Sequence, residues 1–177
     1  MKKTVIIING TGGAGKDTLC GLASKHYKVK NISAITPIKE IAGNYGWNGE
    51  KDSRARKFLS DLKKVFIDYN DMPTKYLHGE YKEFLEGEEE LLFVHIREKE
   101  EIDKFKALVG EACVTLLVER ERKGMKGYRD SWGNASDDEV KDYQYDYYYI
   151  NNKPLPETEK DFVTLIEKIM QKKIGIS

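Results

Sequence analysis

The sequence predicts a single α/β domain in which helices cover both faces of a parallel β-sheet. Two observations favour this fold. Short, continuous apolar runs alternate along the chain with stretches whose apolar residues recur at helical spacing, and continuous runs are typical of strands buried on both faces of a parallel sheet. No repeat or low-complexity linker divides the 177 residues, which at 40% apolar composition are enough for one sizeable core.

The amino-terminal elements follow this alternation in order. Residues 4–9 (TVIIIN) form a β-branched run expected to be a central strand, and a helix is expected from Gly15 to about Tyr27. A weaker strand is expected at 29–34, and Pro37 begins a short helix that ends in the loop 43–49. Between residues 53 and 69 the apolar side chains fall on one helical face, which we expect to pack on the core: Phe58, Leu59, Leu62, Val65, Phe66 and Tyr69.

The carboxyl-terminal elements continue the pattern. Strands are expected at 91–96 and 113–118, with a helix at 98–109 between them that Gly110 ends. Polar, charged and glycine-containing residues then follow, too irregular for a core element, and we expect them to form a mobile lid. A last strand at 145–150 precedes a closing helix. The start of this helix is predicted at a capping box of Thr158 and Asp161.

Composition excludes several kinds of partner. Thirty basic residues balance thirty acidic ones, so the chain lacks the positive field that attracts nucleic acid or anionic lipid. The longest apolar run, Val5 to Ile8, is far too short to span a membrane or to serve as a signal peptide, and we expect a cytoplasmic protein. Cys20 and Cys113 show no metal or redox spacing and are expected to be buried free thiols. The tyrosines of 142–150 are expected on an edge-side strand rather than in base stacking.

The segment GTGGAGKDT, residues 10–18, carries the strongest functional signal. It fits G-x-x-x-x-G-K between a predicted strand and a predicted helix, the context in which glycines turn backbone N–H groups around phosphates. Lys16 is expected to bridge the β- and γ-phosphates of ATP. The residues expected to bind the nucleotide are Gly10, Gly12, Gly13, Ala14, Gly15, Lys16, Asp17 and Thr18.

Two departures from the usual pattern concern magnesium. Asp17 holds the position where a Ser or Thr usually ligates Mg²⁺, and Thr18 follows one residue late. Either Thr18 contacts the phosphates while Mg²⁺ keeps most of its waters, or Asp17 approaches the hydrated metal. The strand LLFVHIRE places His95 or Arg97 where an Asp would usually end it, so we expect a weakly anchored metal and charge stabilisation that depends on arginines.

With GKDT, TPIKE, HIRE and YDYYYINN in this order, the chain resembles the phage-type deoxynucleoside monophosphate kinases and their adenylate-kinase-like relatives over nearly its full length. The resemblance implies a three-layer P-loop NTPase fold with a five-stranded parallel sheet, and ATP-dependent phosphoryl transfer to a small phosphorylated acceptor. It also implies one kinase domain over 1–177. The expected parts are a core at about 1–35, 90–118 and 143–177, an acceptor-binding helical insert at about 36–80, and a lid at about 119–139.

The resemblance also implies roles for single residues. Thr36, Pro37 and Lys39 resemble the segment that opens the acceptor-binding helix, and Arg56, with Arg54 as the rival, is expected to reach the acceptor phosphate. Asn152, in the loop 151–154, is expected to border the adenine.

Two arginines are expected at the carboxyl edge of the sheet, where ligands bind in open α/β folds. Arg97 follows a buried strand directly and is expected to act in catalysis and to bind the acceptor. Arg120, with Arg122 as a weaker choice, is expected to neutralise charge at the base of the lid. Basic residues farther into the lid are interpreted as loop solubility residues.

Three functions stay open at this point. The first is a kinase for a (deoxy)nucleoside monophosphate. The second is a P-loop kinase for another small metabolite, such as dephospho-coenzyme A or phosphomevalonate. The third is a nucleotide-binding or ATPase module without kinase activity, which the missing Asp and the several candidate arginines disfavour. The chain is expected to be a monomer or a homodimer.

Overall fold

A computed structural model of the chain describes residues 3–110, 113–120 and 140–172. Its centre is a parallel five-stranded sheet with the strand order β2-β3-β1-β4-β5. The predicted parallel α/β fold is therefore confirmed. The strands are β1 (Thr4–Asn9), β2 (Val29–Ser33), β3 (Leu91–His95), β4 (Cys113–Glu119) and β5 (Tyr147–Ile150).

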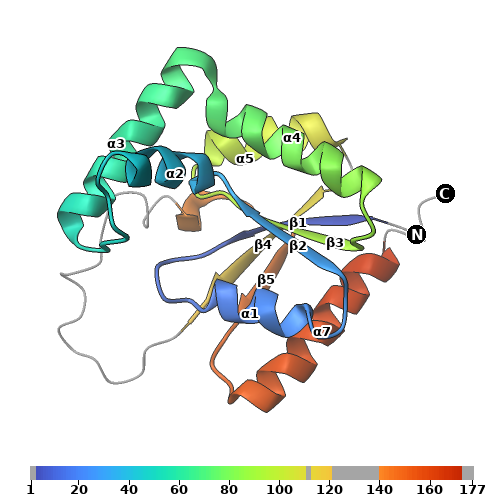
Figure 1. The fold of residues 1–177 in the computed structure, drawn as a ribbon. Helices are drawn as coiled ribbons and strands as arrows, with labels where there is room; N and C mark the ends of the chain where they lie inside the picture. The colour runs from blue at the N-terminus through green and yellow to red at the C-terminus, as the bar shows by residue number, and fades with distance from the viewer. Residues whose placement is uncertain (1–2, 111–112, 121–139, 173–177) are drawn as a thin grey trace.

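Helices cover both faces of the sheet and complete three layers (Figure 1). On one face lie α1 (Lys16–Ala23) and α7 (Leu155–Lys172). On the other side lie α2 (Thr36–Asn44), α3 (Ser53–Asn70), α4 (Met72–Glu86) and α5 (Lys99–Val109). A single 3₁₀ turn, η2 (Val140–Asp142), precedes β5.

The two halves of the core follow from the alternation of side chains along the strands. In β1, where every residue is buried, Ile6 and Ile8 pack with α1 and α7, whereas Val5 and Ile7 pack toward α4 and α5. This explains why the strand is apolar throughout: both of its faces lie against helices. Both cysteines are free and buried, as expected. Within the described part of the chain, no helix has the length and apolar character that a membrane span requires.

The helix α3 corrects one expectation. Phe58, Val65 and Tyr69 were expected to face the core, but their exposed fractions are 46%, 60% and 82%. The helix does not lie against the sheet; it packs on α2 and α4 and stands out from the body in Figure 1. Only a narrow stripe of α3, formed by Ala55, Leu59 and Lys63, is buried. The predicted apolar face is wider than this stripe, so it overestimates the contact of the helix with the core.

Three further boundaries differ from the sequence prediction. The helix α4 was not predicted, because its buried apolar residues are few and separated by charged ones, and the expected end of the insert near residue 80 falls inside it. The closing helix begins at Leu155, so a capping box at Thr158 is wrong; the Thr158 hydroxyl instead donates to the Lys153 carbonyl oxygen at 3.0 Å. The last strand begins at Tyr147 rather than Tyr145.

Candidate active site

The loop between β1 and α1 has a backbone that requires glycine. Gly10, Gly13 and Gly15 have positive φ angles of 148°, 77° and 91°. A Cβ on Gly10 would lie 2.2 Å from the Val118 carbonyl oxygen, and one on Gly15 would lie 2.4 Å from Nδ2 of Asn151. The glycines therefore serve two purposes, since they allow the turn and they let the loop lie directly against the ends of neighbouring segments.

Lys16 lies over this loop. Its Nζ donates to the carbonyl oxygens of Gly10 at 2.6 Å and Thr11 at 3.3 Å, which holds the ammonium group beside the backbone of the turn. The N-cap of α1 is Gly15, which has no side chain to satisfy the first N–H groups of the helix. A helix amino terminus, a turn of glycines and a lysine thus gather at one place, and this combination suits the phosphates of a nucleotide.

Two buried asparagines hold the loop in place, and neither was selected from the sequence. Asn9 Oδ1 accepts from the Gly10 N–H at 2.8 Å, while its Nδ2 donates to the Arg97 carbonyl oxygen at 3.2 Å and to the Tyr145 hydroxyl at 2.9 Å. Asn151 Nδ2 donates to the Ala14 carbonyl oxygen at 2.9 Å. For Asn9 the available signal was a polar residue at the end of a buried strand, whereas Asn151 follows the half-exposed β5 and gave no such signal. The partners, 88 to 137 residues distant in sequence, could not be inferred.

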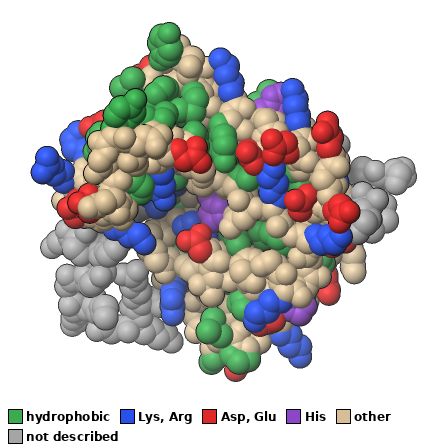
Figure 2. Space-filling model, in the orientation of Figure 1, with side chains coloured by type: hydrophobic (Ala, Val, Ile, Leu, Met, Phe, Trp, Pro, Cys, Tyr) green, Lys and Arg blue, Asp and Glu red, His purple; other side chains and the backbone are tan. Residues whose placement is uncertain are grey.

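A hollow of about 200 Å³ opens beside the loop at the carboxyl edge of the sheet. Figure 2 shows basic, acidic and histidine side chains around a depression on this face of the molecule. The structure brings three of the predicted site residues, Asp17, Thr36 and Lys39, together here. The full lining is Asp17, Asn31, Ile32, Ser33, Thr36, Lys39 and His95.

His95 also belongs to this lining, and it is uncharged. Its Nε2 lies 2.8 Å from Asn31 Oδ1 and 3.9 Å from Cys20 Sγ. Burial lowers the pKa of His95 to about 4, despite the opposing charge of Asp17, and burial raises the pKa of Cys20 to about 12. At neutral pH both groups are therefore neutral, so the charges at the hollow come from Asp17 and Lys39.

The predicted arginines are not among the residues that line this hollow, and they are exposed to different degrees. Arg97 is exposed and follows β3 by two residues, with its backbone carbonyl held by Asn9. Arg56 is half-buried, whereas Arg54 is exposed. Arg56 lies seven residues, or about two turns, before the buried Lys63 and so shares its helix face; Arg54, nine residues away, lies on the opposite face. Of the two rivals, Arg56 is the one whose position suits the inner side of the insert.

Solved structures share the fold of this chain, although no protein-family model and no curated protein matches the sequence. A thymidylate kinase from Candida albicans covers 96% of this chain and 94% of its own, with a TM-score of 0.53 and 13% identity. A shikimate kinase from Aquifex aeolicus covers 97% and 99%, with a TM-score of 0.51 and 13% identity. A Chloroflexus aurantiacus protein described provisionally as a kinase covers 97% of both chains, with a TM-score of 0.58 and 11% identity.

The chain has the P-loop kinase fold. At these identities the similarity concerns the fold alone, including the five-stranded parallel sheet. The loop 10–15 is the P-loop of this fold by its position between β1 and α1 and by its backbone geometry.

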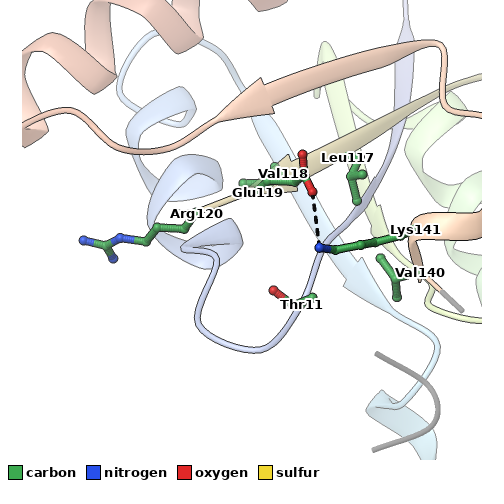
Figure 3. Close-up of a pocket in the computed structure, with 7 residues that line it drawn as sticks. All are labelled: Thr11, Leu117, Val118, Glu119, Arg120, Val140 and Lys141. Atoms are coloured by element: carbon green, nitrogen blue, oxygen red, sulfur yellow. Dashed lines mark ion pairs between the residues drawn. The ribbon is translucent and has the colours of Figure 1, made fainter. Parts of the chain in front are cut away.

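A second, smaller hollow lies between the P-loop and the end of β4 (Figure 3). Its lining includes Thr11, Glu119, Arg120 and Lys141. In Figure 3 the Arg120 guanidinium points away from the other residues, whereas Lys141 points toward Glu119, with Nζ 3.8 Å from Oε1. Lys141, which was not selected from the sequence, is therefore the basic side chain that faces inward here. Arg122 and most of the expected lid, residues 121–139, lie outside the described residues.

Three further residues predicted to bind the nucleotide or Mg²⁺, Asn152, Asp17 and Thr18, are exposed. Asn152 follows β5 and is exposed, whereas Asn151 is buried against the P-loop. Asp17 and Thr18 are exposed in the first turn of α1. In the described residues, no three His, Cys, Asp or Glu side chains gather as a metal site. A carboxylate and a hydroxyl beside a phosphate site nevertheless fit Mg²⁺, which prefers oxygen ligands and commonly binds through one or two protein groups plus phosphate oxygens.

Proposed function

We propose that this protein transfers the γ-phosphoryl group of ATP to a small phosphorylated acceptor, with a (deoxy)nucleoside monophosphate as the first candidate. The observation that carries the proposal is the position of an anion-suited loop and a polar hollow side by side at one edge of the sheet. The P-loop with Lys16 would hold the donor, and the hollow with Thr36 and Lys39 opens beside it. A site for two substrates side by side is what direct transfer needs, because phosphoryl transfer depends mainly on positioning and charge stabilisation.

The roles of the residues follow from their positions. The P-loop amides and Lys16 would bind the β- and γ-phosphates, and Asn152 would border the adenine. Lys39, Arg56 and Arg97 would hold the phosphate of the acceptor. Arg120 would add positive charge near the end of β4.

Magnesium would be held by Asp17 and Thr18, directly or through its waters, together with phosphate oxygens. It would neutralise charge on the transferring phosphoryl group. The neutral His95 lies beside Asn31 as a polar wall of the hollow and not as a general base, because its lowered pKa of about 4 makes it a weak proton acceptor.

A kinase for another small metabolite is the second candidate. Shikimate kinase and thymidylate kinase share the fold with this chain to nearly the same degree, so the fold does not favour one acceptor class over the other. In addition, Asp17 puts an acidic side chain in the lining of the hollow, where it would repel an acceptor phosphate unless a cation lies between them. An uncharged hydroxyl acceptor would not meet this repulsion.

A panel assay tests the proposal. Purified protein with Mg·ATP is incubated with each ribo- and deoxynucleoside monophosphate, and with shikimate and sugar alcohols, while release of ADP is recorded. We expect acceptor-dependent ADP release with at least one nucleoside monophosphate. Lys16→Ala should reduce turnover by about 10²-fold or more with the fold intact by circular dichroism. Lys168→Ala, a change of an exposed lysine on α7, is the matched control and should leave turnover unchanged.

ADP release with only the non-phosphorylated acceptors would replace the first candidate by the second. Absence of acceptor-dependent release across the whole panel would remove the first candidate and, of the second, the acceptors that the panel contains.

A further inference from the structure

Lys63 is a charged residue in a place where the helix pattern calls for an apolar one. It belongs to the buried stripe of α3, after Ala55 and Leu59, and is 6% exposed. Its Nζ donates to Glu98 Oε2 at 2.5 Å, and the two side chains are 8% and 33% exposed. The pair joins the insert helix α3 to the turn between β3 and α5.

Stability alone does not account for this pair. Desolvating two charges costs several kcal/mol, so replacing a buried ion pair by apolar side chains is commonly neutral or stabilising. Leu59, one turn earlier on the same stripe, packs in an apolar cluster with Ile38 and Ala42 of α2, and an apolar residue at 63 could extend that packing. We therefore look for the role of this ion pair in the segments that it positions rather than in the stability of the fold.

The two ends of the pair lie beside the two arginines proposed to bind the acceptor. On α3, Arg56 lies about two turns before Lys63 on the same face. On the other side, Glu98 directly follows Arg97, and its own backbone carbonyl accepts from the Ile102 N–H at 3.0 Å in the first turn of α5. Asn9 holds the Arg97 carbonyl oxygen from β1. The ion pair thus ties the helix that carries Arg56 to a turn that is itself fixed to the sheet.

Glu98 is also an immediate neighbour that could compete for Arg97. Burial raises the pKa of Glu98, but the charge and hydrogen bond of Lys63, together with a backbone hydrogen bond and the charge of Arg97, more than offset this, so its pKa lies below the ordinary value and the carboxylate is ionised. With Lys63 in place, the negative charge is satisfied by an ammonium group at 2.5 Å. Without it, the carboxylate would lose its ammonium partner, and Arg97, whose charge already lowers the pKa of Glu98, would be the cation left beside it to pair with instead of an acceptor phosphate.

We propose that Lys63 is a positioning residue for the acceptor: it sets the spacing of Arg56 and Arg97 across the acceptor site and keeps Glu98 from pairing with Arg97. The inference rests on the proposed kinase function and deepens it, because it assigns the acceptor half of the site to a contact between the insert and the core. The ATP half, formed by the P-loop, does not depend on this contact.

Steady-state kinetics of Lys63→Met test the proposal, with the acceptor found in the panel assay. We expect the KM for the acceptor to rise about tenfold or more, while the KM for ATP stays within about twofold. Lys64→Met is the matched control, because Lys64 is exposed on the same helix, and it should leave both constants unchanged. Lys63→Arg keeps the charge and should restore most of the acceptor affinity.

A double variant separates positioning from simple support of the fold. In Lys63→Met/Glu98→Gln no carboxylate remains to compete for Arg97, so the KM for the acceptor should fall back partway toward wild type relative to Lys63→Met alone. A purely structural role predicts no such recovery. Where Lys63→Met does not fold, Glu98→Gln takes its place and should raise the KM for the acceptor severalfold.

Three results would overturn the inference while leaving the kinase function intact. They are an unchanged KM for the acceptor in Lys63→Met, an equal loss for ATP and acceptor, and a lowered melting temperature without a change in the KM for the acceptor. A wild-type chain without acceptor-dependent turnover would instead overturn the proposed function, and the inference with it, before any variant is compared.

Discussion

Burial decides which groups of the site carry charge. His95, in the lining of the hollow, lies 3.9 Å from Cys20 Sγ, and desolvation favours the neutral form of both groups. Lys16 and Asp17 stand above them at the start of α1. The charged groups are therefore those that can reach a ligand, while the groups beneath them form an uncharged polar floor.

The neutral state of His95 has a consequence for stability. In an unfolded chain a histidine protonates near its ordinary pKa of about 6.5, whereas His95 in the fold resists protonation until about pH 4. Because the unfolded state then binds more protons between these values, the stabilisation is fully present above pH 6.5 and is lost as the pH falls toward 4. We predict that the free energy of unfolding of the metal-free protein drops by about 3 kcal/mol from this residue across that window.

Urea unfolding at a series of pH values measures this dependence. His95→Gln should show a flatter profile than wild type between pH 6.5 and 4. Because acidic residues contribute to both profiles, the quantity compared is the difference between wild type and variant. Parallel profiles for wild type and His95→Gln would show that His95 protonates as readily in the fold as outside it.

At the scale of elements, the sequence predicts the P-loop itself but not the hydrogen bonds that hold it in place. The motif is local: nine consecutive residues, 10–18, contain the glycines of the turn and Lys16, and they directly follow the predicted strand. The hydrogen bonds that fix the turn come from Asn9 and Asn151, whose partners are set by the packing of β1, β3 and β5. Such long-range pairings leave no periodic pattern in the sequence from which they could be predicted. The helix α4 was missed for a related reason, because a helix with few buried residues has a weak amphipathic pattern.

Substitution of glycine by alanine is expected to have opposite effects at Gly10, which lies against β4, and at Gly21 in α1. Gly10→Ala would put a methyl group 2.2 Å from the Val118 carbonyl oxygen, in a backbone conformation that L-residues rarely adopt. We expect a loss of about 2 kcal/mol or more in unfolding free energy, together with loss of ATP binding. Gly21→Ala adds a methyl group within α1 that meets nothing within 4 Å, and it should stabilise by about 0.5–1 kcal/mol.

Chemical unfolding and titration with a fluorescent ATP analogue measure both effects. Equal stability of Gly10→Ala and wild type would mean that the loop can move away from β4 at no cost.

For the whole molecule, the three-layer architecture followed from the sequence because burial on two faces makes the central strands β1 and β3 almost continuously apolar. The arrangement of the insert did not, since it depends on contacts between segments. Lys63 is an example: within its own helix it looks like a solvated lysine, and only its pairing with Glu98, 35 residues later, reveals a buried position. The larger hollow, proposed to bind the acceptor, likewise takes residues from α1, β2, α2 and β3, which the fold brings to one edge.

That common edge leads to a prediction about binding at the scale of the molecule. If donor and acceptor lie side by side, a single compound that joins adenosine to the acceptor nucleoside through a polyphosphate chain occupies both places at once, and the second contact becomes intramolecular. We expect such a compound to bind about 100-fold more tightly than a non-hydrolysable ATP analogue. At saturating concentration this corresponds to about 2.7 kcal/mol of additional stabilisation and a melting temperature roughly 5–10 °C higher.

Thermal unfolding with each ligand in turn gives the comparison. Lys39→Ala should reduce the additional shift given by the joined compound while the shift given by the ATP analogue stays the same, because Lys39 lines only the acceptor hollow. Lys16→Ala should reduce both shifts, because each ligand places phosphates on the P-loop. Should the joined compound stabilise the protein no more than the ATP analogue does, the hollow would not be the acceptor site, and the two substrates would not meet at this edge of the sheet.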